Sequence, residues 1–570
     1  MELAGIPPVP PEVLSGYAAA GLWEAGGLRD GLERHAGRTP GKVALADAAG
    51  TWSYERLEEQ VARGVACLRR LGVDPGTPVL VIAPLAAEAV AAYHAIIRCG
   101  GIAVMLDRKC GQADVRNARD LLGGRLTITT AGLARRLALT ETGDGGRVIV
   151  FDALGQHPDA CRDWPEPDLR APRAVVFTSG TTSRPKGVVH SLNTLRAGAD
   201  SMARSLALTA QDAAFLSTPV ASITGLVQVH LTLDRGARLI LEDQFEPSGS
   251  LDRLRDHRTT VLGGAPVIIE ELFREAARRQ VTDLPLRAIC LGGTMIPRPV
   301  LAYAIEQFGI VPTRVYGSSE TPCATTTAPS DRDDARIGDD GVAAAGVELA
   351  TASVEVATAG VEFATAGVEL GPAGHRAGEL LVRGPMRFLG YLDPADNREA
   401  FADGGWFRTG DLASIERGRL TITGRVKEVI ARKGMKISLA EVDAAAAALA
   451  GVHEAACYGV PDDETGERLV LAVRCAGQRP GFDDITGQLR ASGLAVWKLP
   501  EEIVYWDEPL PRTASGKVQR RAVAAGAAGR DVSQAARLSG RNRRQSLGPD
   551  NPVLRPDDPA LGPDDPVPTP

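Results

Sequence analysis

One polar loop of small residues constrains this chain more than any other stretch. It runs from Val176 to His190 and reads VFTSGTTSRPKGVVH. The apolar run at residues 174–177 predicts a buried strand that leads into it. Small residues let backbone N–H groups approach a ligand, and such groups with hydroxyls and a lysine form a cradle for an anion. We therefore expect a polyphosphate-binding loop, with a flexible loop that binds nothing as the alternative.

The loop is not a Walker A motif, because Gly187 follows Lys186 where that motif has Ser or Thr. If it binds ATP, it does so in another fold.

Composition and charge narrow the class of protein. The chain has 570 residues, of which 44% are hydrophobic and 24% charged, as is typical of a soluble protein with several domains. Its net charge of -7 argues against general nucleic-acid binding. Eight cysteines without a CxxC pair predict reduced thiols, a cytoplasmic setting and no zinc ribbon. Neither a signal peptide nor a membrane span is expected.

Apolar runs alternate with helical segments along most of the chain. Residues 79–82 and 102–106 read as strands around a helix at 86–99, and similar runs recur as far as residue 316. This alternation predicts parallel sheets covered by helices. The first two dozen residues, rich in Pro and Gly, are expected to form an extended arm.

Two low-complexity segments interrupt this pattern. Residues 346–370 repeat a seven-residue unit, GVELATA, whose apolar residues lie two apart, a spacing typical of strands. We expect an extra β-ribbon or a surface loop there. Residues 526–570 carry a basic patch and end in Pro- and Asp-rich repeats, which predict a disordered tail.

Several polar motifs follow predicted strands, where ligands bind in open α/β sheets. Tyr316 could stack on a flat base, Glu320 could hold Mg²⁺, and Asp411 could accept hydrogen bonds from a ribose diol. Each motif also has a structural explanation, with Tyr316 in the core, Asp411 in a turn and Lys517 as a solvated charge.

Taken together and in order, the motifs resemble those of a known superfamily. They are FTSGTTSRPKGVVH, YGSSET, GELLVRGP, GWFRTGDL, GRVKEVI and PRTASGK. They are similar to the signatures of the ANL superfamily of adenylate-forming enzymes, which includes acyl- and aryl-CoA synthetases. The resemblance implies an α/β fold with three parts. These are a large N-terminal domain of β-sheets covered by helices (1–426), a small mobile α+β C-terminal domain (427–525) and the disordered tail (526–570).

The resemblance also implies roles for individual residues. The phosphate loop would comprise Thr178, Ser179, Gly180, Thr181, Thr182, Ser183 and Lys186. The rest of the nucleotide site would comprise Gly292, Gly293, Thr294, Tyr316, Gly317, Ser318, Thr321, Asp411 and Arg425, with Asp411 on the ribose. Glu320 would be the Mg²⁺ ligand, and Thr181, Glu320 and Lys517 would be catalytic. Lys427 would be the domain hinge, and Gly434 would contact the pantetheine arm of CoA.

The expected substrate pocket departs from many acyl- and aryl-CoA ligases. Ser222 stands where they carry a His, three residues before Gly225, and we place both residues in this pocket. Val220, Ala221 and Ile223 favour an apolar acyl group, and the Asp that grips an α-amino group in amino-acid-activating domains is missing.

These observations predict an ATP-dependent carboxylic acid–CoA ligase that uses ATP, Mg²⁺ and coenzyme A. It would form an acyl-AMP from a small carboxylic acid with release of pyrophosphate, and then a thioester with CoA. Because the first step joins two anions, a lysine and Mg²⁺ are needed to cancel their repulsion. Two alternatives stay open. One is a stand-alone enzyme that loads a carrier-protein phosphopantetheine in trans, and the other is a catalytically dead homologue acting as a binding module.

Overall fold

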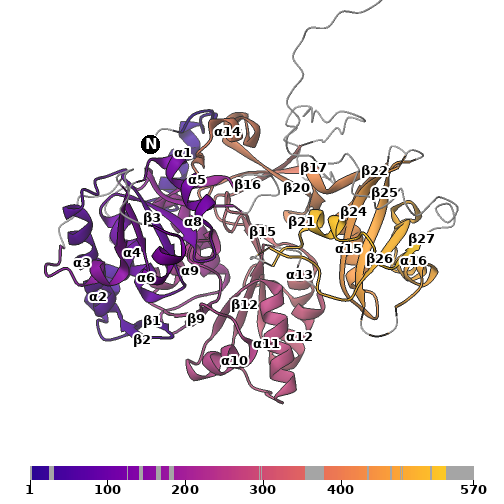
Figure 1. Cartoon of the computed structure of the whole chain (residues 1–570), viewed down its shortest axis with the longest axis horizontal. Coiled ribbons are helices and arrows are strands. Elements are labelled where there is room, and N and C mark those ends of the chain that lie inside the picture. The colour runs from indigo at the N-terminus through magenta and orange to yellow at the C-terminus, as the bar shows by residue number, and fades with distance from the viewer. Residues whose placement is uncertain are drawn as a thin grey trace, which may run out of the picture. The chain divides into compact units, whose positions relative to one another are not determined.

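The computed structural model describes the chain in separate ranges. They are residues 3–24, 31–124, 126–139, 146–161, 168–178, 185–293, 296, 298–352, 378–432, 435–462, 465–475, 477, 479–513 and 516–534. Contacts divide the protein into two units, one of residues 1–427 with 514–517, and one of residues 428–513 with those from 518 onward. Figure 1 follows the chain from indigo to yellow. The predicted fold class is confirmed, because a large α/β N-terminal domain precedes a smaller C-terminal one.

One sheet of the first unit contains the strands on either side of the opening loop. Its described strands, in the order β18-β8-β7-β4-β3-β5-β6, are β3 (Pro78–Ala83), β4 (Ile102–Asp107), β5 (Leu126–Thr129), β6 (Arg147–Val150), β7 (Pro172–Phe177), β8 (Gly187–Ser191) and β18 (Gly390–Tyr391). Neighbours from β7 to β6 are parallel, whereas β8 is antiparallel to β7 and to β18. The opening loop therefore joins two antiparallel strands, and a segment distant in sequence pairs with the second.

The helices in this part of the chain follow simple sequence rules. They are α2 (Gly31–Arg38), α3 (Tyr54–Arg70), α4 (Ala87–Arg98), α5 (Gln112–Leu122), α6 (Ala131–Arg136), α7 (Phe151–Gly155) and α8 (Leu192–Ser205). α3 begins after Ser53, because the Ser53 hydroxyl accepts a hydrogen bond from the N–H of Arg56 at 3.1 Å. Its buried residues Leu57, Val61 and Leu68 recur at helical spacing and face the core.

The second sheet of this unit is larger and mixed. Its 14 described strands are β1 (Val43–Asp47), β2 (Gly50–Ser53), β9 (Ala213–Leu216), β10 (Arg238–Leu241), β11 (Val261–Gly264), β12 (Ala288–Gly292), β13 (Val311–Tyr316), β14 (Thr325–Thr326), β15 (Val342–Ala343), β16 (Glu348–Ala352), β17 (Gly378–Arg383), β19 (Phe401–Ala402), β20 (Trp406–Glu416) and β21 (Arg419–Arg425). The neighbours β1-β10-β9-β11-β12-β13 are parallel, as predicted. From β13 to β16 the pairing is antiparallel, and these further strands lie beyond residue 316, where the predicted alternation ends.

Further helices accompany the larger sheet. They are α9 (Ile223–Asp234), α10 (Pro247–Asp256), α11 (Pro266–Arg278), α12 (Arg298–Phe308), α13 (Asp333–Gly338) and α14 (Pro394–Ala400), with the 3₁₀ helix η1 (Asp403–Gly405). In Figure 1, α11 and α12 lie side by side next to β12.

The second unit has one sheet buried on both faces. Its elements are β22 (Val429–Arg432), β23 (Met435–Ser438), β24 (Val452–Asp462), β25 (Gly466–Cys475), β26 (Glu502–Trp506), β27 (Val532–Gln534), α15 (Leu439–Ala447), α16 (Phe482–Ala491), α17 (Arg520–Ala525) and the 3₁₀ helix η3 (Val496–Lys498). Along β25, Leu469 and Leu471 pack with α15 and α16, whereas Val470 and Ala472 pack with α17. This alternation follows from the two-residue period of a strand.

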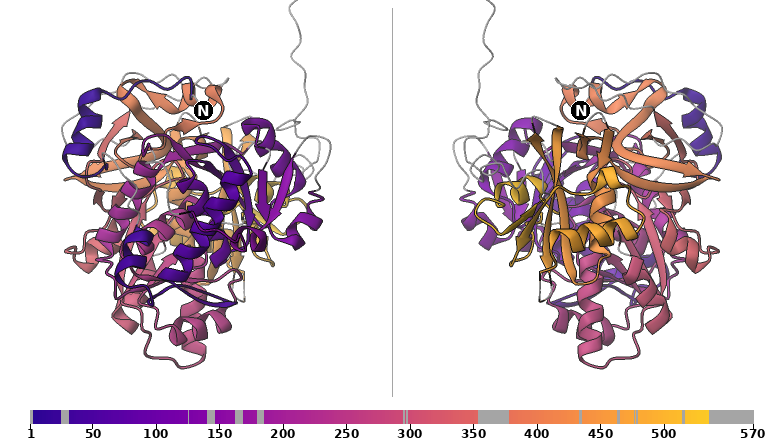
Figure 2. Two further views of the ribbon diagram at one scale, coloured as in Figure 1. Left: turned by 90° about the vertical axis from the view of Figure 1, so that its left-hand side faces the viewer. Right: turned by 90° about the vertical axis from the view of Figure 1, so that its right-hand side faces the viewer.

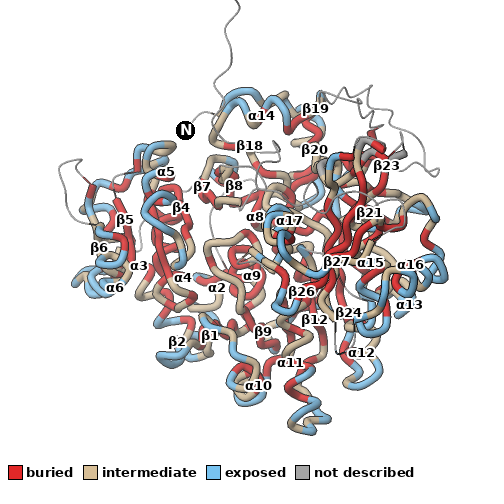
Figure 3. The backbone as a smooth tube through the Cα atoms, turned by 45° about the vertical axis from the view of Figure 1, so that its right-hand side comes forward, coloured by how far each residue is buried: buried red, intermediate tan, exposed pale blue. Residues whose placement is uncertain are grey.

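Figure 2 shows the orange and yellow strands of the second unit side by side. Figure 3 shows that burial concentrates on the strands, with β4, β5 and β26 almost wholly red.

Two predictions about the chain ends need correction. The N-terminal arm contains a helix, α1 (Pro11–Ala19), which buries Tyr17. Pro11 favours this start, because the first helical position needs no N–H donor. The predicted disordered tail begins too early, because β27 pairs with β26 beyond residue 525. Residues 535–570 lie outside the described ranges.

The prediction for the GVELATA repeat is tested only in part. The first GVELATA copy forms β16, whereas residues 353–377 are not described. The eight cysteines, all within the described ranges, form no disulfide bond. No helix in the described ranges has the length and apolar character that a bilayer crossing requires.

Candidate active site

The ends of the opening loop are fixed by the β7–β8 hairpin. Phe177 lies opposite Gly187 in this pair, and the N–H of Thr178 donates to the carbonyl of Lys186 at 3.0 Å. The loop residues between them, Ser179, Gly180, Thr181, Thr182 and Ser183, lie outside the described residues. The two ends of the predicted phosphate loop are thus held together by the pairing of β7 with β8.

The Lys186 side chain lies between an acid and an aromatic ring. Its Nζ is 2.8 Å from Oδ1 of Asp396 on α14 and 4.8 Å from the centroid of the Tyr391 ring. A cation over the face of an aromatic ring is attracted by the quadrupole of the ring. Asp396 is therefore the described counter-ion of the predicted phosphate-binding lysine.

Glu320 contacts the hydroxyl of the same tyrosine. The Tyr391 hydroxyl donates to Oε1 of Glu320 at 2.7 Å, and the N–H of Phe388 donates to the Glu320 carbonyl at 2.7 Å. Burial and the Glu320 charge raise the pKa of Tyr391, so its hydroxyl stays protonated and donates. The structure thus places Lys186 and the predicted Mg²⁺ ligand on one shared side chain.

A short turn fixes the loop around Glu320. The Ser318 hydroxyl accepts hydrogen bonds from the N–H groups of Glu320 and Thr321, at 3.2 and 3.3 Å. A side chain at Gly317 would collide with backbone, because its Cβ would lie 2.6 Å from the N of Cys323. These contacts give Gly317, Ser318 and Thr321 a structural role, and their predicted nucleotide contacts stay a prediction.

His190 joins β8 directly to the Glu320 loop. It is fully buried, with Nε2 at 2.7 Å from the Ser319 carbonyl and Nδ1 at 2.9 Å from the Thr194 hydroxyl. Burial lowers the pKa of His190 to about 4, so the ring is neutral near pH 7. Because a carbonyl can only accept, the proton resides on Nε2.

A second cluster lies where β13 and the β20–β21 hairpin meet. The Tyr316 hydroxyl donates to Oδ2 of Asp411 at 2.8 Å, and Nε of Arg425 donates to Oδ1 at 2.7 Å. Asp411 and Arg425 are direct partners in the β20–β21 register. Burial, with a smaller contribution from Asp411, raises the pKa of Tyr316, so it remains a neutral donor. The structure brings these three predicted nucleotide-binding residues together, and Asp411 lies in a strand rather than a turn.

The predicted glycines of the nucleotide site lie where β12 ends. A Cβ at Gly292 would lie 2.6 Å from the Val315 carbonyl, so β13 approaches too closely for a side chain. Gly293 has φ of +79° and faces open space. Thr294 lies outside the described residues.

Ser222 and Gly225 have a clear local role at the start of α9. The Ser222 hydroxyl donates to the Pro219 carbonyl at 2.8 Å and accepts from the Gly225 N–H at 3.0 Å. A Cβ at Gly225 would lie 2.1 Å from the Pro219 carbonyl. Val220 and Ile223 are buried in the main core. The hydroxyl thus caps the helix, and the role of these residues in a substrate pocket stays a prediction.

The remaining predicted residues lie in the C-terminal part of the sequence. Lys517 is exposed, on a loop between Arg512 and Val518, which form an isolated antiparallel bridge. Lys427 lies in the 3₁₀ helix η2 (Val426–Glu428), although its side chain is not described. Gly434 lies outside the described residues. The assigned roles of all three stay predictions.

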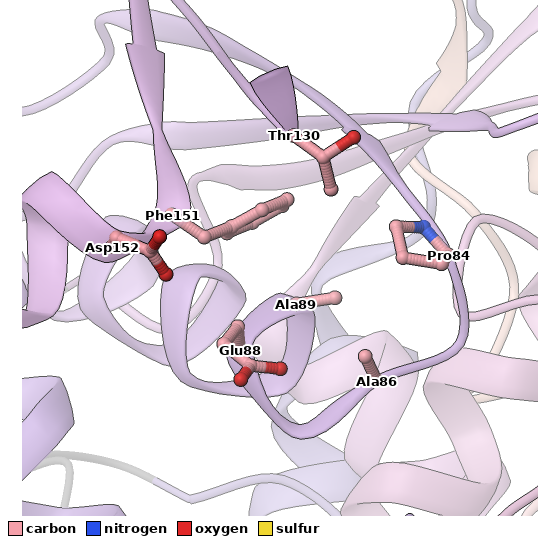
Figure 4. A pocket seen from close by; sticks show the side chains of 7 residues that line it. All are labelled: Pro84, Ala86, Glu88, Ala89, Thr130, Phe151 and Asp152. Atoms are coloured by element: carbon pink, nitrogen blue, oxygen red, sulfur yellow. The ribbon is translucent and has the colours of Figure 1, made fainter. Parts of the chain in front are cut away.

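Figure 4 shows a separate hollow of about 230 Å³ in the first unit. It is lined by Pro84, Ala86, Glu88, Ala89, Thr130, Phe151 and Asp152. It lies beyond the carboxyl ends of β3, β5 and β6, and none of the predicted site residues lines it. The hollow is therefore distinct from the two clusters described above.

The donor set around Glu320 fits a nucleotide-bound Mg²⁺. No group of three or more His, Cys, Asp or Glu side chains within the described ranges could hold a metal by itself. Mg²⁺ is usually held by one or two carboxylates together with substrate phosphates and waters. Because the Tyr391 hydroxyl contacts only Oε1, the Glu320 carboxylate keeps lone pairs for a cation.

Sequence reasoning missed three members of this site, namely His190, Tyr391 and Asp396. His190 lies within the opening stretch itself, so its position beside the loop was the available signal. Tyr391 and Asp396 follow the GELLVRGP motif, and nothing in their neighbourhood marks them as partners of residue 186.

The loop between β7 and β8, the acidic residue Glu320 and the cluster of Tyr316, Asp411 and Arg425 are what the predicted site of an adenylate-forming enzyme requires. The model of the AMP-binding enzyme family matches residues 32–392, and the model of its C-terminal domain matches residues 441–517. The chain therefore belongs to the AMP-binding enzyme family, as the ANL-type motifs predicted.

Individual relatives span nearly the whole chain. An indoleacetate–CoA ligase of Aromatoleum aromaticum is 29% identical, over 86% of this chain and 96% of the relative. The fatty acid–[acyl-carrier-protein] ligase MmaC of Mycobacterium marinum is 32% identical, over 87% of this chain and 97% of the relative. The crystal structure of ATP-bound MatB from Rhodopseudomonas palustris superposes with a TM-score of 0.77 at 24% identity, over 87% of this chain and 98% of that one. The MatB structure therefore has the same fold as this chain.

Proposed function

We propose that this enzyme is an ATP-dependent carboxylic acid–CoA ligase. It activates a small carboxylic acid as an acyl-AMP, releases pyrophosphate, and transfers the acyl group to the thiol of CoA. The observation that carries this proposal is the convergence of Lys186 and Glu320 on Tyr391, because a lysine and a carboxylate beside a phosphate loop suit Mg²⁺-bound ATP. Bound Mg²⁺ would neutralise charge on the phosphates.

The chain's own residues supply the other requirements of adenylation. Asp411, held by Tyr316 and Arg425, presents a fixed acceptor to the ribose diol. Lys186 binds the departing pyrophosphate. Lys517 provides the cation that brings the carboxylate and the α-phosphate together, two anions that would otherwise repel each other. No side-chain nucleophile is needed, because the carboxylate itself attacks.

The acyl group of the acid is proposed to be apolar. Val220, which precedes α9, and Ile223, its first residue, are buried and apolar, and this stretch carries no fixed charge for an amino group. The relatives that act on indoleacetate and on medium-chain fatty acids support both aryl and aliphatic acids as candidates.

Transfer to a carrier protein is the second candidate function. It is favoured by the similarity to MmaC and to a salicyl-AMP ligase of Mycobacterium tuberculosis that is also named a salicyl-S-ArCP synthetase. CoA and carrier proteins present the same phosphopantetheine thiol, so the acceptor separates the two candidates.

A panel of aryl, medium-chain and dicarboxylic acids tests the proposal. Each acid is incubated with ATP and Mg²⁺, alone, with CoA, or with a phosphopantetheinylated carrier protein, and pyrophosphate and thioester are measured. We expect AMP and pyrophosphate to form with at least one acid, and acyl-CoA to appear when CoA is added. Thioester on the carrier alone would favour the second candidate. ATP binding without turnover of any acid would favour a dead homologue.

A further inference from the structure

Tyr391 contacts both the proposed Mg²⁺ ligand, Glu320, and the proposed phosphate-binding residue, Lys186. Its hydroxyl donates to Oε1 of Glu320 at 2.7 Å, while its ring lies 4.8 Å from the ammonium of Lys186. One residue therefore touches both the group proposed to hold Mg²⁺ and the group proposed to hold the phosphates.

The backbone of Tyr391 is held in place by a strand pairing and by two hydrogen bonds. Tyr391 pairs with Val188 in the β18–β8 ladder, directly after the loop that carries Lys186. The fully buried Asn397 side chain accepts from the Tyr391 N–H at 2.7 Å and donates to the Tyr391 carbonyl at 3.0 Å. Both backbone polar groups are thus held by one side chain, which leaves little freedom for the ring.

The ring is also held by its aromatic neighbours. The Phe388 ring lies 4.8 Å from that of Tyr391 in an edge-on arrangement, and Phe388 also donates its N–H to the Glu320 carbonyl. Tyr391 is only 6% exposed. A buried, neutral hydroxyl at a fixed position orients a carboxylate without supplying charge of its own.

We propose that Tyr391 is a positioning residue that sets the Glu320 carboxylate for Mg²⁺ and supports the Lys186 ammonium, so that Mg²⁺ and phosphate binding depend on one side chain. This proposal deepens the proposed function and rests on it. The hydroxyl acts on Glu320, and the ring acts on Lys186. Two substitutions therefore separate the two effects.

Tyr391→Phe removes the hydroxyl and keeps the ring. Because groups that orient a metal ligand typically change metal affinity or activity by about 10- to 100-fold, we expect the Mg²⁺ concentration for half-maximal ATP binding to rise about 10-fold. Metal-free ATP binding should stay within about 2-fold, because the ring still faces Lys186. Tyr391→Leu removes both groups and should weaken metal-free ATP binding as well.

The measurement is calorimetric titration of ATP in the absence of any acid, with and without Mg²⁺. It requires no turnover, so it remains informative if no acid in the panel is activated. In that event the proposed function fails, whereas the inference about Tyr391 is still tested. Tyr303→Phe on α12 is the matched control, because it deletes the same hydroxyl from a ring that packs against Phe273 and Phe308 and not against a proposed site residue.

A double-mutant cycle with Glu320→Gln decides whether Tyr391 acts through Glu320. If it does, Tyr391→Phe has little further effect on Mg²⁺-dependent binding in the Glu320→Gln background, so the two effects are not additive. Additive effects, or a Tyr391→Phe protein with the Mg²⁺ dependence of the wild type, would overturn the proposal. Thermal melting of each variant separates these results from loss of fold.

Discussion

Lys186, the proposed phosphate-binding lysine, and Asp396 form an ion pair of 2.8 Å. Both side chains are about a quarter exposed, at 26% and 28%, so the pair is partly screened by solvent. Asp396 already supplies an anionic partner to the Lys186 ammonium, so we expect it to compete with the phosphates of ATP for that group.

Asp396→Asn should therefore strengthen ATP binding. A partly exposed ion pair contributes up to about 1 kcal/mol, so we expect the Kd of ATP to fall by about 2- to 5-fold at low salt. The gain should shrink as salt is added, because screening weakens the pair that the wild type must break. Glu399→Gln, an exposed acid on the same helix, is the control for the change in charge. Unchanged or weaker ATP binding by Asp396→Asn would contradict a competing role.

Asp411→Asn should weaken ATP binding, and it should weaken AMP binding to a similar extent, because both nucleotides carry the ribose. The substitution keeps the size of the side chain but removes the charge that Tyr316 and Arg425 hold in place. Hydrogen bonds to a charged group contribute about 1.5–3 kcal/mol, so we expect the Kd values to rise by about 10- to 100-fold. Asp403→Asn is an exposed control in η1. An ATP affinity that stays at the wild-type value would show that Asp411 holds the hairpin rather than the nucleotide.

His190 makes stability depend on pH in a defined direction. Its pKa is lowered to about 4 in the folded protein by burial, from an ordinary value of 6.5, so the unfolded chain binds more protons between these values. The free energy of unfolding should therefore fall as the pH is lowered from about 6.5 towards about 4. Burial also lowers the pKa values of His35 and His257, which add to the same trend.

Urea unfolding at about pH 7 and about pH 5 measures this slope. His190→Gln should reduce the difference between the two pH values, even though the variant itself is less stable. A variant with the full wild-type slope would mean that His190 does not titrate on unfolding.

Lys517→Ala should abolish adenylation while ATP binding survives. Removing one group that stabilises charge in the transition state typically costs about 10²- to 10³-fold in kcat. Acyl-AMP formation is measured in single turnover, and ATP binding by calorimetry. Arg490→Ala, which removes an exposed cation of the second unit, should leave both unchanged. Comparable acyl-AMP formation by Lys517→Ala would refute the assigned role.

The sequence predicted the parallel strands well, because each is a short buried run with its own signal. It did not predict that β18 pairs with β8, since a two-residue strand carries no periodicity and its partner lies far away in sequence. Tyr391 was missed for the same reason, because its role arises from that pairing.

For Asp411, the sequence indicated the role of the residue but not its place in the fold. Its residue type indicated a binding role, whereas the β20–β21 register that places it opposite Arg425 is visible only in the fold. Ser222 was assigned to the substrate pocket from its position in a motif. The structure shows that its hydroxyl caps α9, an interaction that depends on local backbone geometry.

Acid-dependent exchange of labelled pyrophosphate into ATP, measured without CoA, tests the central claim most directly. The exchange reports reversible acyl-AMP formation and nothing that follows it. We predict exchange that requires both an acid from the panel and Mg²⁺, and that is lost in Glu320→Gln and Lys517→Ala. Exchange that needs no acid, or conversion of ATP to ADP instead of AMP, would contradict the account.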